Sequence, residues 1–187
     1  YCVCLGSLIS DRERAAHKEL LPFSGLLEKL LLAHRAGDSM EFQKLIEERR
    51  TIRKYSPESR ITKEDLLAVI RAAQEAPSWK NSQTGRYYCV MSEEMVEKVS
   101  RECLPEMNQA KAENASLIVT TFVHNHAGFQ KDGTPDNELG NGWGCYDLGL
   151  QNENLVLKAK DMGLDTLIMG IRDSEKLREY LEIPASQ

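Results

Sequence analysis

The segment Glu48-Arg49-Arg50-Thr51-Ile52-Arg53-Lys54-Tyr55 gathers four guanidinium or ammonium groups and a hydroxyl in a chain whose formal net charge is -5. Arginine carries a planar, permanently charged fork that matches the oxygens of a phosphate, and the Thr51 hydroxyl can donate to the same oxygens. For such a run taken alone, a solvated and charged helix end is the alternative interpretation. An anion-binding site is therefore predicted only in combination with the motifs that follow.

Length and composition predict one folded domain. The chain has 187 residues, of which 41% are hydrophobic and 28% charged, as in ordinary globular proteins. The net negative charge argues against a general nucleic-acid surface, and the chain has no apolar run of the roughly 20 residues that span a bilayer. We therefore expect neither nucleic acid nor a membrane as a partner.

The cysteines are scattered along the chain without the C-x-x-C spacing of a zinc site. They are Cys2, Cys4, Cys89, Cys103 and Cys145. Their odd number favours reduced thiols over a disulfide framework, so a reducing cytoplasm is the expected location. The first residues also lack the basic region of a secretory signal. The pair His124 and His126 has no evident third ligand, so we expect no metal site.

Hydrophobic periodicity predicts strands and helices in succession. Strands are expected at residues 2–9, with a break at Gly6, and at 86–91, 116–123 and 166–169. Helices are expected at 40–48, at 62–76 after a capping box, at 92–114 with an interruption near Pro105, at 142–162, and from Ser174. The run 116–123 is apolar and β-branched, which predicts a central strand buried on both faces. The turn-rich stretch 124–141 predicts a long loop beside a site.

Two further motifs follow the arginine run. Ala76-Pro77-Ser78-Trp79-Lys80-Asn81-Ser82-Gln83 comes one helix later, and Asn152-Glu153-Asn154-Leu155-Val156-Leu157 is followed by Met162-Gly163-Leu164-Asp165-Thr166-Leu167-Ile168-Met169-Gly170. Together, in this order, the motifs resemble the FMN-dependent nitroreductase family over residues 40–187. The resemblance implies an α+β fold with three α/β/α layers and a central mixed, mainly antiparallel sheet. It also implies flanking helices and an extended arm exchanged between dimer subunits.

The order of the segments departs from the family in one respect. The family's last part, a core strand followed by a basic, proline-containing arm, is missing after Gln187, and residues 1–35 resemble that part. We therefore expect a single domain, 1–187, that is circularly permuted, with residues 36–39 as the linker to the main body 40–187. An unrelated N-terminal extension on a truncated chain is the alternative. A first segment outside the sheet would contradict the permutation.

The resemblance implies that the arginine run binds FMN. The residues that resemble its phosphate side are Arg49, Arg50 and Thr51. Arg53 resembles the basic residue that reaches the ribityl chain and the N1–O2 edge of the ring, where a cation favours the negative charge of reduced flavin. Lys18 resembles a further phosphate ligand, although Leu20 replaces the arginine usual in the family. An exposed surface lysine is the alternative for Lys18.

The resemblance also implies how the flavin ring is held. The residues that resemble a loop contributed by the partner subunit are Pro77, Ser78, Asn81 and Gln83, and this implies a homodimer. Thr84-Gly85 stands where the family usually has proline and tryptophan. Met169 and Gly170 resemble the turn whose backbone N–H points at flavin N5, the atom that exchanges hydride. Glycine suits such a close backbone approach, and an ordinary glycine at a strand end is the alternative.

The activity that the resemblance implies is the reduction of nitroaromatics, quinones or similar small electrophiles by NAD(P)H. NAD(P)H would deliver hydride to FMN and leave, and the acceptor would then occupy the same face, in a ping-pong order. No nucleophile is needed, in keeping with the lack of a Ser-His-Asp or Cys-His arrangement. The 124–141 loop, with Phe129 and Trp143, is expected to shape the acceptor pocket. The alternatives are a dehalogenase-like flavin enzyme of the same fold and a flavin-binding or storage protein without turnover.

Overall fold

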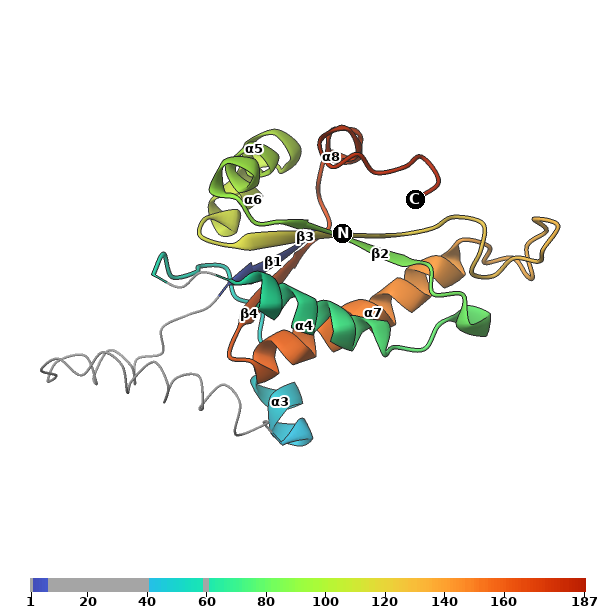
Figure 1. Ribbon diagram of the computed structural model, residues 1–187, viewed down its shortest axis with the longest axis horizontal. Helices are drawn as coiled ribbons and strands as arrows, with labels where there is room; N and C mark the ends of the chain where they lie inside the picture. The colour runs from blue at the N-terminus through green and yellow to red at the C-terminus, as the bar shows by residue number, and fades with distance from the viewer. Residues whose placement is uncertain (1, 7–40, 59–60) are drawn as a thin grey trace, which may run out of the picture.

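The computed structural model describes residues 2–6, 41–58 and 61–187 (Figure 1). Its centre is a four-stranded sheet in the order β2-β3-β1-β4. The strands are β1 (Cys2–Gly6), β2 (Gly85–Val90), β3 (Ser116–Phe122) and β4 (Asp165–Met169). Each pair of neighbouring strands is antiparallel, and a parallel bridge joins Thr51 to Thr166 of β4.

β1 lies between β3 and β4 and is buried along its whole length. It forms backbone pairs with both neighbours from Cys2 to Leu5. Because successive side chains of a strand point to opposite faces, Cys2 and Cys4 enter one hydrophobic core and Val3 and Leu5 enter the other. The same five-residue strand thus contributes to the cores on both sides of the sheet.

Helices cover both faces of the sheet (Figure 1). One face carries α4 (Lys63–Gln74) and α7 (Gly142–Asp161), with α3 (Phe42–Glu48) beside α7. The other face carries α5 (Glu93–Cys103), α6 (Glu106–Ala112) and α8 (Ser174–Tyr180). The structure therefore has the three-layer α+β architecture that the sequence predicts. No helix in the described ranges is both long and apolar enough to cross a membrane.

The local signals read from the sequence mark helix ends. The Thr62 hydroxyl accepts from the Asp65 backbone N–H at 3.1 Å, and the Asp65 carboxylate accepts from the Thr62 backbone N–H at 3.0 Å, so the predicted capping box opens α4. Pro105 lies between α5 and α6, as predicted, because proline cannot continue a helix. In α3 only Leu45 is buried, whereas Phe42 is 67% and Ile46 44% exposed.

One end of the sheet gathers the segments on which the site depends. Because neighbouring strands are antiparallel, the starts of β1 and β2 lie at the same end as the ends of β3 and β4. The 77–84 loop, which contains the short 3-10 helix η1 (Trp79–Asn81), enters β2 there. The predicted long loop 124–141 leaves β3 at the same end, and both loops lie at the right of Figure 1.

The predicted arm and linker lie outside the described residues. The structure gives no account of residues 1, 7–40 and 59–60, which include Lys18 and the linker 36–39. The arm exchanged between subunits and the role of Lys18 therefore stay predictions.

The position of β1 agrees with the condition set by the permutation hypothesis. The Tyr88 hydroxyl donates to Gln187 Oε1 at 2.7 Å, Tyr88 pairs with Val119, and Val119 pairs with Cys2. Two strand spacings, about 10 Å, therefore separate the backbones of Tyr88 and Cys2. Gln187 thus contacts Tyr88, which lies across the sheet from Cys2, the first residue of β1. This arrangement supports the permutation, which stays a prediction.

The permutation can be tested by reordering the chain. A protein that begins at Met40 and carries residues 1–39 after Gln187 should fold, because β1 would follow the segment that already lies near its start. We expect the same far-UV circular dichroism and a single cooperative urea transition. A protein that lacks residues 1–39 is the control, and it should lose cooperative unfolding because the middle of the sheet is removed. A shortened chain as stable as the full one would contradict the prediction.

Candidate functional site

The arginine run lies along the outer edge of β4. Thr51 bridges to Thr166, and the Ile52 backbone N–H donates to the Thr166 carbonyl at 3.1 Å. Arg50 Nη1 donates to the Arg49 carbonyl at 2.7 Å. Among residues 2–6, 41–58 and 61–187, no ion pair joins Arg49, Arg50 or Arg53 to a carboxylate. Within the described residues, nothing therefore neutralises these guanidinium groups, as an anion-binding run requires.

The 77–84 loop has an unusual backbone. Lys80, Asn81 and Gln83 have φ values of 48°, 55° and 50°, in the left-handed region that non-glycine residues rarely adopt. The loop closes on Ser78, whose carbonyl accepts from the Asn81 N–H and whose hydroxyl accepts from the Gln83 N–H, both at 3.0 Å. The side chains of Asn81 and Gln83 are exposed and joined by a hydrogen bond of 3.1 Å. They present amide groups to any neighbouring molecule.

Two polar atoms at the base of this loop lack a partner. Ser82 Oγ and Thr84 Oγ1 are buried, and neither has a hydrogen-bond partner in the part of the chain that the structure describes. Buried hydroxyl groups are normally hydrogen-bonded, so these two atoms are exceptions within the described residues.

The two groups of predicted residues lie at opposite edges of the sheet. Residues 49–53 run beside β4, and the 77–84 loop leads into β2. Three strand spacings, about 14 Å, separate these edges. The structure therefore brings Arg49, Arg50, Thr51 and Arg53 together, and separately Pro77, Ser78, Asn81 and Gln83. It does not join the two groups within one chain.

Met169 and Gly170 close β4 at the end of the sheet that gathers the loops. The Met169 side chain is buried in the core, so only its backbone is open to a ligand. Gly170 is exposed, and a Cβ built on it would meet no atom within 4 Å. Arg172 Nη1 donates to the Gly170 carbonyl at 2.8 Å. The space above the Gly170 backbone is therefore open to the approach of a flat ring.

Both tryptophans of the chain lie in a cluster between the two loops. The rings of Trp79 and Trp143 are 4.1 Å apart, and Tyr146 meets Trp143 edge-on at 5.9 Å. We call these three residues the tryptophan cluster. Asp136 Oδ2 accepts from Trp79 Nε1 at 3.0 Å and from Lys80 Nζ at 2.8 Å. The 124–141 loop is therefore attached to the 77–84 loop.

Comparison with known proteins decides the family. The profile of the Nitroreductase family matches residues 46–187. The chain belongs to the nitroreductase family. A protein of Archaeoglobus fulgidus, provisionally named NADH dehydrogenase/NAD(P)H nitroreductase, is 28% identical over 153 residues, which cover 77% of this chain and 78% of the relative. Protein YdgI of Bacillus subtilis, provisionally named an NAD(P)H nitroreductase, is 31% identical over 83 residues, which cover 44% of this chain and 39% of the relative.

Solved structures of the family have the same fold. A nitroreductase family protein from Clostridium novyi NT superposes with a TM-score of 0.64 at 27% identity, covering 79% of each chain. A crystal structure described as an oxidoreductase containing FMN superposes with a TM-score of 0.63 at 26% identity, covering 80% of this chain and 73% of the other. The three-layer arrangement around the sheet is therefore that of the nitroreductase family.

Two carboxylates of this nitroreductase-family chain were not predicted as site residues. They are Asp136 and Asp147, and Asp147 Oδ2 accepts from the Trp79 backbone N–H at 2.9 Å. Asp147 is 2% exposed and lies on the buried face of α7, among residues spaced three and four apart. A carboxylate at a buried position of a helix is unusual, and the sequence contains this signal in the three- and four-residue spacing of α7. No comparable signal marks Asp136, which lies in a loop.

The surroundings shift the pKa values of these carboxylates in opposite directions. The hydrogen bond from Lys80 lowers the pKa of Asp136, partial burial opposes that effect, and the bond from Trp79 adds to it. Burial raises the pKa of Asp147, and the hydrogen bond from the Trp79 backbone lowers it by less. Asp136 is thus held ionised, whereas Asp147 depends on the Trp79 N–H to offset its burial.

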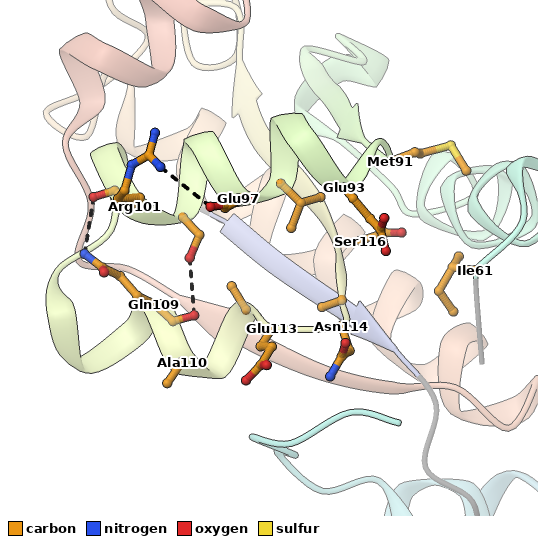
Figure 2. A pocket seen from close by; sticks show the side chains of 14 residues that line it. Ile61, Met91, Glu93, Glu97, Arg101, Gln109, Ala110, Glu113, Asn114 and Ser116 are labelled. Atoms are coloured by element: carbon orange, nitrogen blue, oxygen red, sulfur yellow. Dashed lines mark hydrogen bonds and ion pairs between the residues drawn. The ribbon is translucent and has the colours of Figure 1, made fainter. Parts of the chain in front are cut away.

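A cavity of about 570 Å³ lies elsewhere, between α5, α6 and the start of β3 (Figure 2). Arg101 pairs with Glu97 at its rim, and the Ser100 hydroxyl donates to the Gln109 carbonyl. None of the predicted site residues lines this cavity. Within the described ranges, no group of three or more His, Cys, Asp or Glu side chains is arranged to hold a metal ion.

The tryptophan cluster gives a pH prediction. Because the pKa of Asp136 is lowered in the folded chain, its carboxylate stabilises the loop contact above the unfolded pKa of about 3.9, and this contribution is lost as the pH falls further. We expect tryptophan emission to shift to longer wavelength below about pH 4 while far-UV circular dichroism is retained. Asp136→Asn should lack that step. The same emission profile in both proteins would contradict this role of Asp136.

Proposed function

We propose that this nitroreductase-family protein is an FMN-dependent NAD(P)H oxidoreductase that reduces nitroaromatics, quinones or similar small electrophiles. The observation that carries the proposal is the run of guanidinium groups beside β4, which have no carboxylate partner among the described residues. The same strand leads into the open Gly170 backbone. An FMN-containing oxidoreductase with the same fold is 26% identical to this chain. The names of two curated relatives also refer to NAD(P)H nitroreductases.

The residues fit the three parts of FMN. The exposed or half-buried cations Arg49, Arg50 and Arg53 suit its phosphate and ribityl side. Thr51, within the run, lies beside Thr166, and an extended strand places Gly170 about 13 Å further along. The edge of β4 is therefore long enough for an elongated ligand. The open space above Gly170 suits a flat ring. Amide groups such as those of Asn81 and Gln83 suit the polar edge of the ring.

The chain's residues would bind and orient the cofactor. When bound, FMN would supply the redox chemistry, a ping-pong hydride exchange between NAD(P)H and an acceptor. Arg53 would place a positive charge near the ring, which stabilises negative charge that develops there. The Gly170 backbone would approach the ring closely because it carries no side chain.

We also propose a homodimer with shared sites. The residues that suit the phosphate and those that suit the ring edge lie at opposite edges of the sheet, so each complete site would need two chains. The exposed Phe42 supplies apolar surface that a second chain could cover. The oxidoreductase activity would then depend on assembly.

The decisive experiment follows the colour of the protein. The purified or FMN-reconstituted protein should show the visible spectrum of bound flavin, lose it on anaerobic addition of NADPH or NADH, and regain it when a nitroaromatic is added. A protein that binds FMN but is not bleached would be a storage protein. Bleaching without reoxidation by nitroaromatics or quinones would favour a specialised, dehalogenase-like enzyme. Failure to bind FMN at all would overturn the proposal.

Removing one cation should weaken FMN binding. Arg49→Ala deletes a charge-assisted contact, which typically costs about 1.5–3 kcal/mol, so the dissociation constant should rise roughly 10- to 150-fold. Lys63→Ala is the matched control, because Lys63 is an exposed cation at the start of α4. Fluorescence titration with FMN measures both constants. Equal affinities in the two variants would argue against a phosphate role for Arg49.

A methyl group on Gly170 should affect binding without affecting folding. A Cβ at Gly170 meets no protein atom, so Gly170→Ala should keep the wild-type unfolding transition, yet its methyl group would enter the space assigned to the flavin ring. Gly149→Ala is the control, because its Cβ also meets nothing and it lies within α7. We expect FMN affinity to fall about tenfold for Gly170→Ala only, as for other small steric clashes. Unchanged affinity would place the ring elsewhere.

A further inference from the structure

Asp147 is a buried carboxylate aimed at one backbone group of a distant loop. It lies on α7, is 2% exposed, and its Oδ2 accepts from the Trp79 N–H at 2.9 Å across 68 positions of sequence. An ionised carboxylate is costly to bury unless it is hydrogen-bonded. Helix packing alone does not require a carboxylate here, since an apolar side chain of similar size would pack as well. The hydrogen bond to the loop is therefore the feature that distinguishes Asp147 from its apolar neighbours.

The N–H that Asp147 holds belongs to the first residue of η1. The next residues, Lys80 and Asn81, and then Gln83 adopt left-handed conformations, which persist only where the surroundings hold them. Within the loop, Ser78 accepts from the Asn81 and Gln83 N–H groups. Asp147 connects this self-contained turn to the rigid α7. The conformation that presents Asn81 and Gln83 thus has an anchor in the helical layer.

A second anchor lies on the other side of Trp79. Asp136 accepts from the Trp79 indole N–H and from Lys80 Nζ, and the indole ring stacks on Trp143 of α7. Trp143 Nε1 in turn donates to Asn137 of the 124–141 loop at 2.9 Å. The backbone, the ring edge and the ring face of Trp79 are therefore each held by a different group.

We propose that Asp147 is a positioning residue of the flavin site. By holding the Trp79 backbone, it fixes the left-handed turn that presents Asn81 and Gln83 to the flavin bound by the partner subunit, and Asp136 holds the same residue from the 124–141 loop. The inference rests on the proposed function, because it assigns this loop to the polar edge of FMN. Asp147 itself is 2% exposed and would act only through the loop that it holds.

Conservative and apolar replacements separate positioning from packing. Asp147→Asn keeps an oxygen that can accept from the Trp79 N–H, and it should bind FMN within about threefold of wild type. Asp147→Leu keeps the bulk and loses the acceptor, and it should bind FMN at least about tenfold more weakly. Its unfolding temperature is expected close to that of wild type, because removing a buried carboxylate and leaving the Trp79 N–H without its acceptor act in opposite directions. Its FMN-free form should also show red-shifted tryptophan emission, since both tryptophans lie in the cluster.

Asp136→Ala gives an independent route if Asp147→Leu does not fold. Asp136 is only partly buried and lies in a loop, so its loss leaves the core intact. Asp136→Ala should also weaken FMN binding. The double variant Asp136→Ala with Asp147→Asn should bind FMN about as weakly as Asp136→Ala alone. The inference would be overturned if Asp147→Leu bound FMN with wild-type affinity and an unchanged flavin spectrum. If Asp147→Leu is unfolded, the same result in Asp136→Ala would overturn it. Failure of the wild-type protein to bind FMN would instead overturn the proposed function.

Mixed dimers test whether Asp147 acts on the partner's site. Arg49→Ala and Asn81→Ala chains, unfolded and refolded together, form the reference pair, and Arg49→Ala with Asp147→Leu forms the test pair. Random pairing makes about half of the dimers mixed, and each mixed dimer has one site free of both changes, so about a quarter of all sites should regain wild-type FMN affinity. If wild-type FMN affinity returned in the reference pair but not in the test pair, Asp147 would not act through the 77–84 loop, and the inference would be overturned. Recovery in neither pair would overturn the site shared between subunits.

Discussion

The pairing of β1 with a strand on each side is the interaction on which this domain depends. It satisfies the backbone donors and acceptors in the middle of the sheet, and its alternating side chains enter both cores. Without β1, the edges of β3 and β4 that now pair with it would be left unpaired. Because the arginine run attaches to β4 through Thr166, the position of β1 also determines where the candidate site lies.

The sequence predicts most elements because their signals are local. The Thr62 capping box, Pro105 and the β-branched run 116–122 each act within a few residues, and the structure has a helix start, a helix break and an inner strand at these places. Placing β1 inside the sheet required the resemblance to a family, because five apolar residues do not by themselves name their partners. The family profile matches only residues 46–187, so β1 lies outside the matched range.

The contacts that hold the 77–84 loop were not predictable in the same way. Asp136 and Asp147 meet Trp79 across 57 and 68 positions of sequence, and no spacing rule relates residues so far apart. The sequence does place Asp147 on the buried stripe of α7, where a carboxylate needs a partner, but it does not say which partner. The same limit applies to α3. The spacing of Phe42, Leu45 and Ile46 predicts that they share one apolar face of the helix, but not that only Leu45 is buried within the chain.

The position of β1 also affects the order in which the domain can form. During synthesis β1 emerges before every other described strand, whereas its neighbours β3 and β4 emerge late. Contacts between distant parts of a chain form slowly, because a long loop must close before they are gained. Until β3 and β4 are made, β1 lacks the two strands that pair with it in the finished sheet, and an unpaired apolar strand favours aggregation and chaperone binding. Among the described strands, the one buried along its whole length in the finished fold is thus the one made longest before its partners.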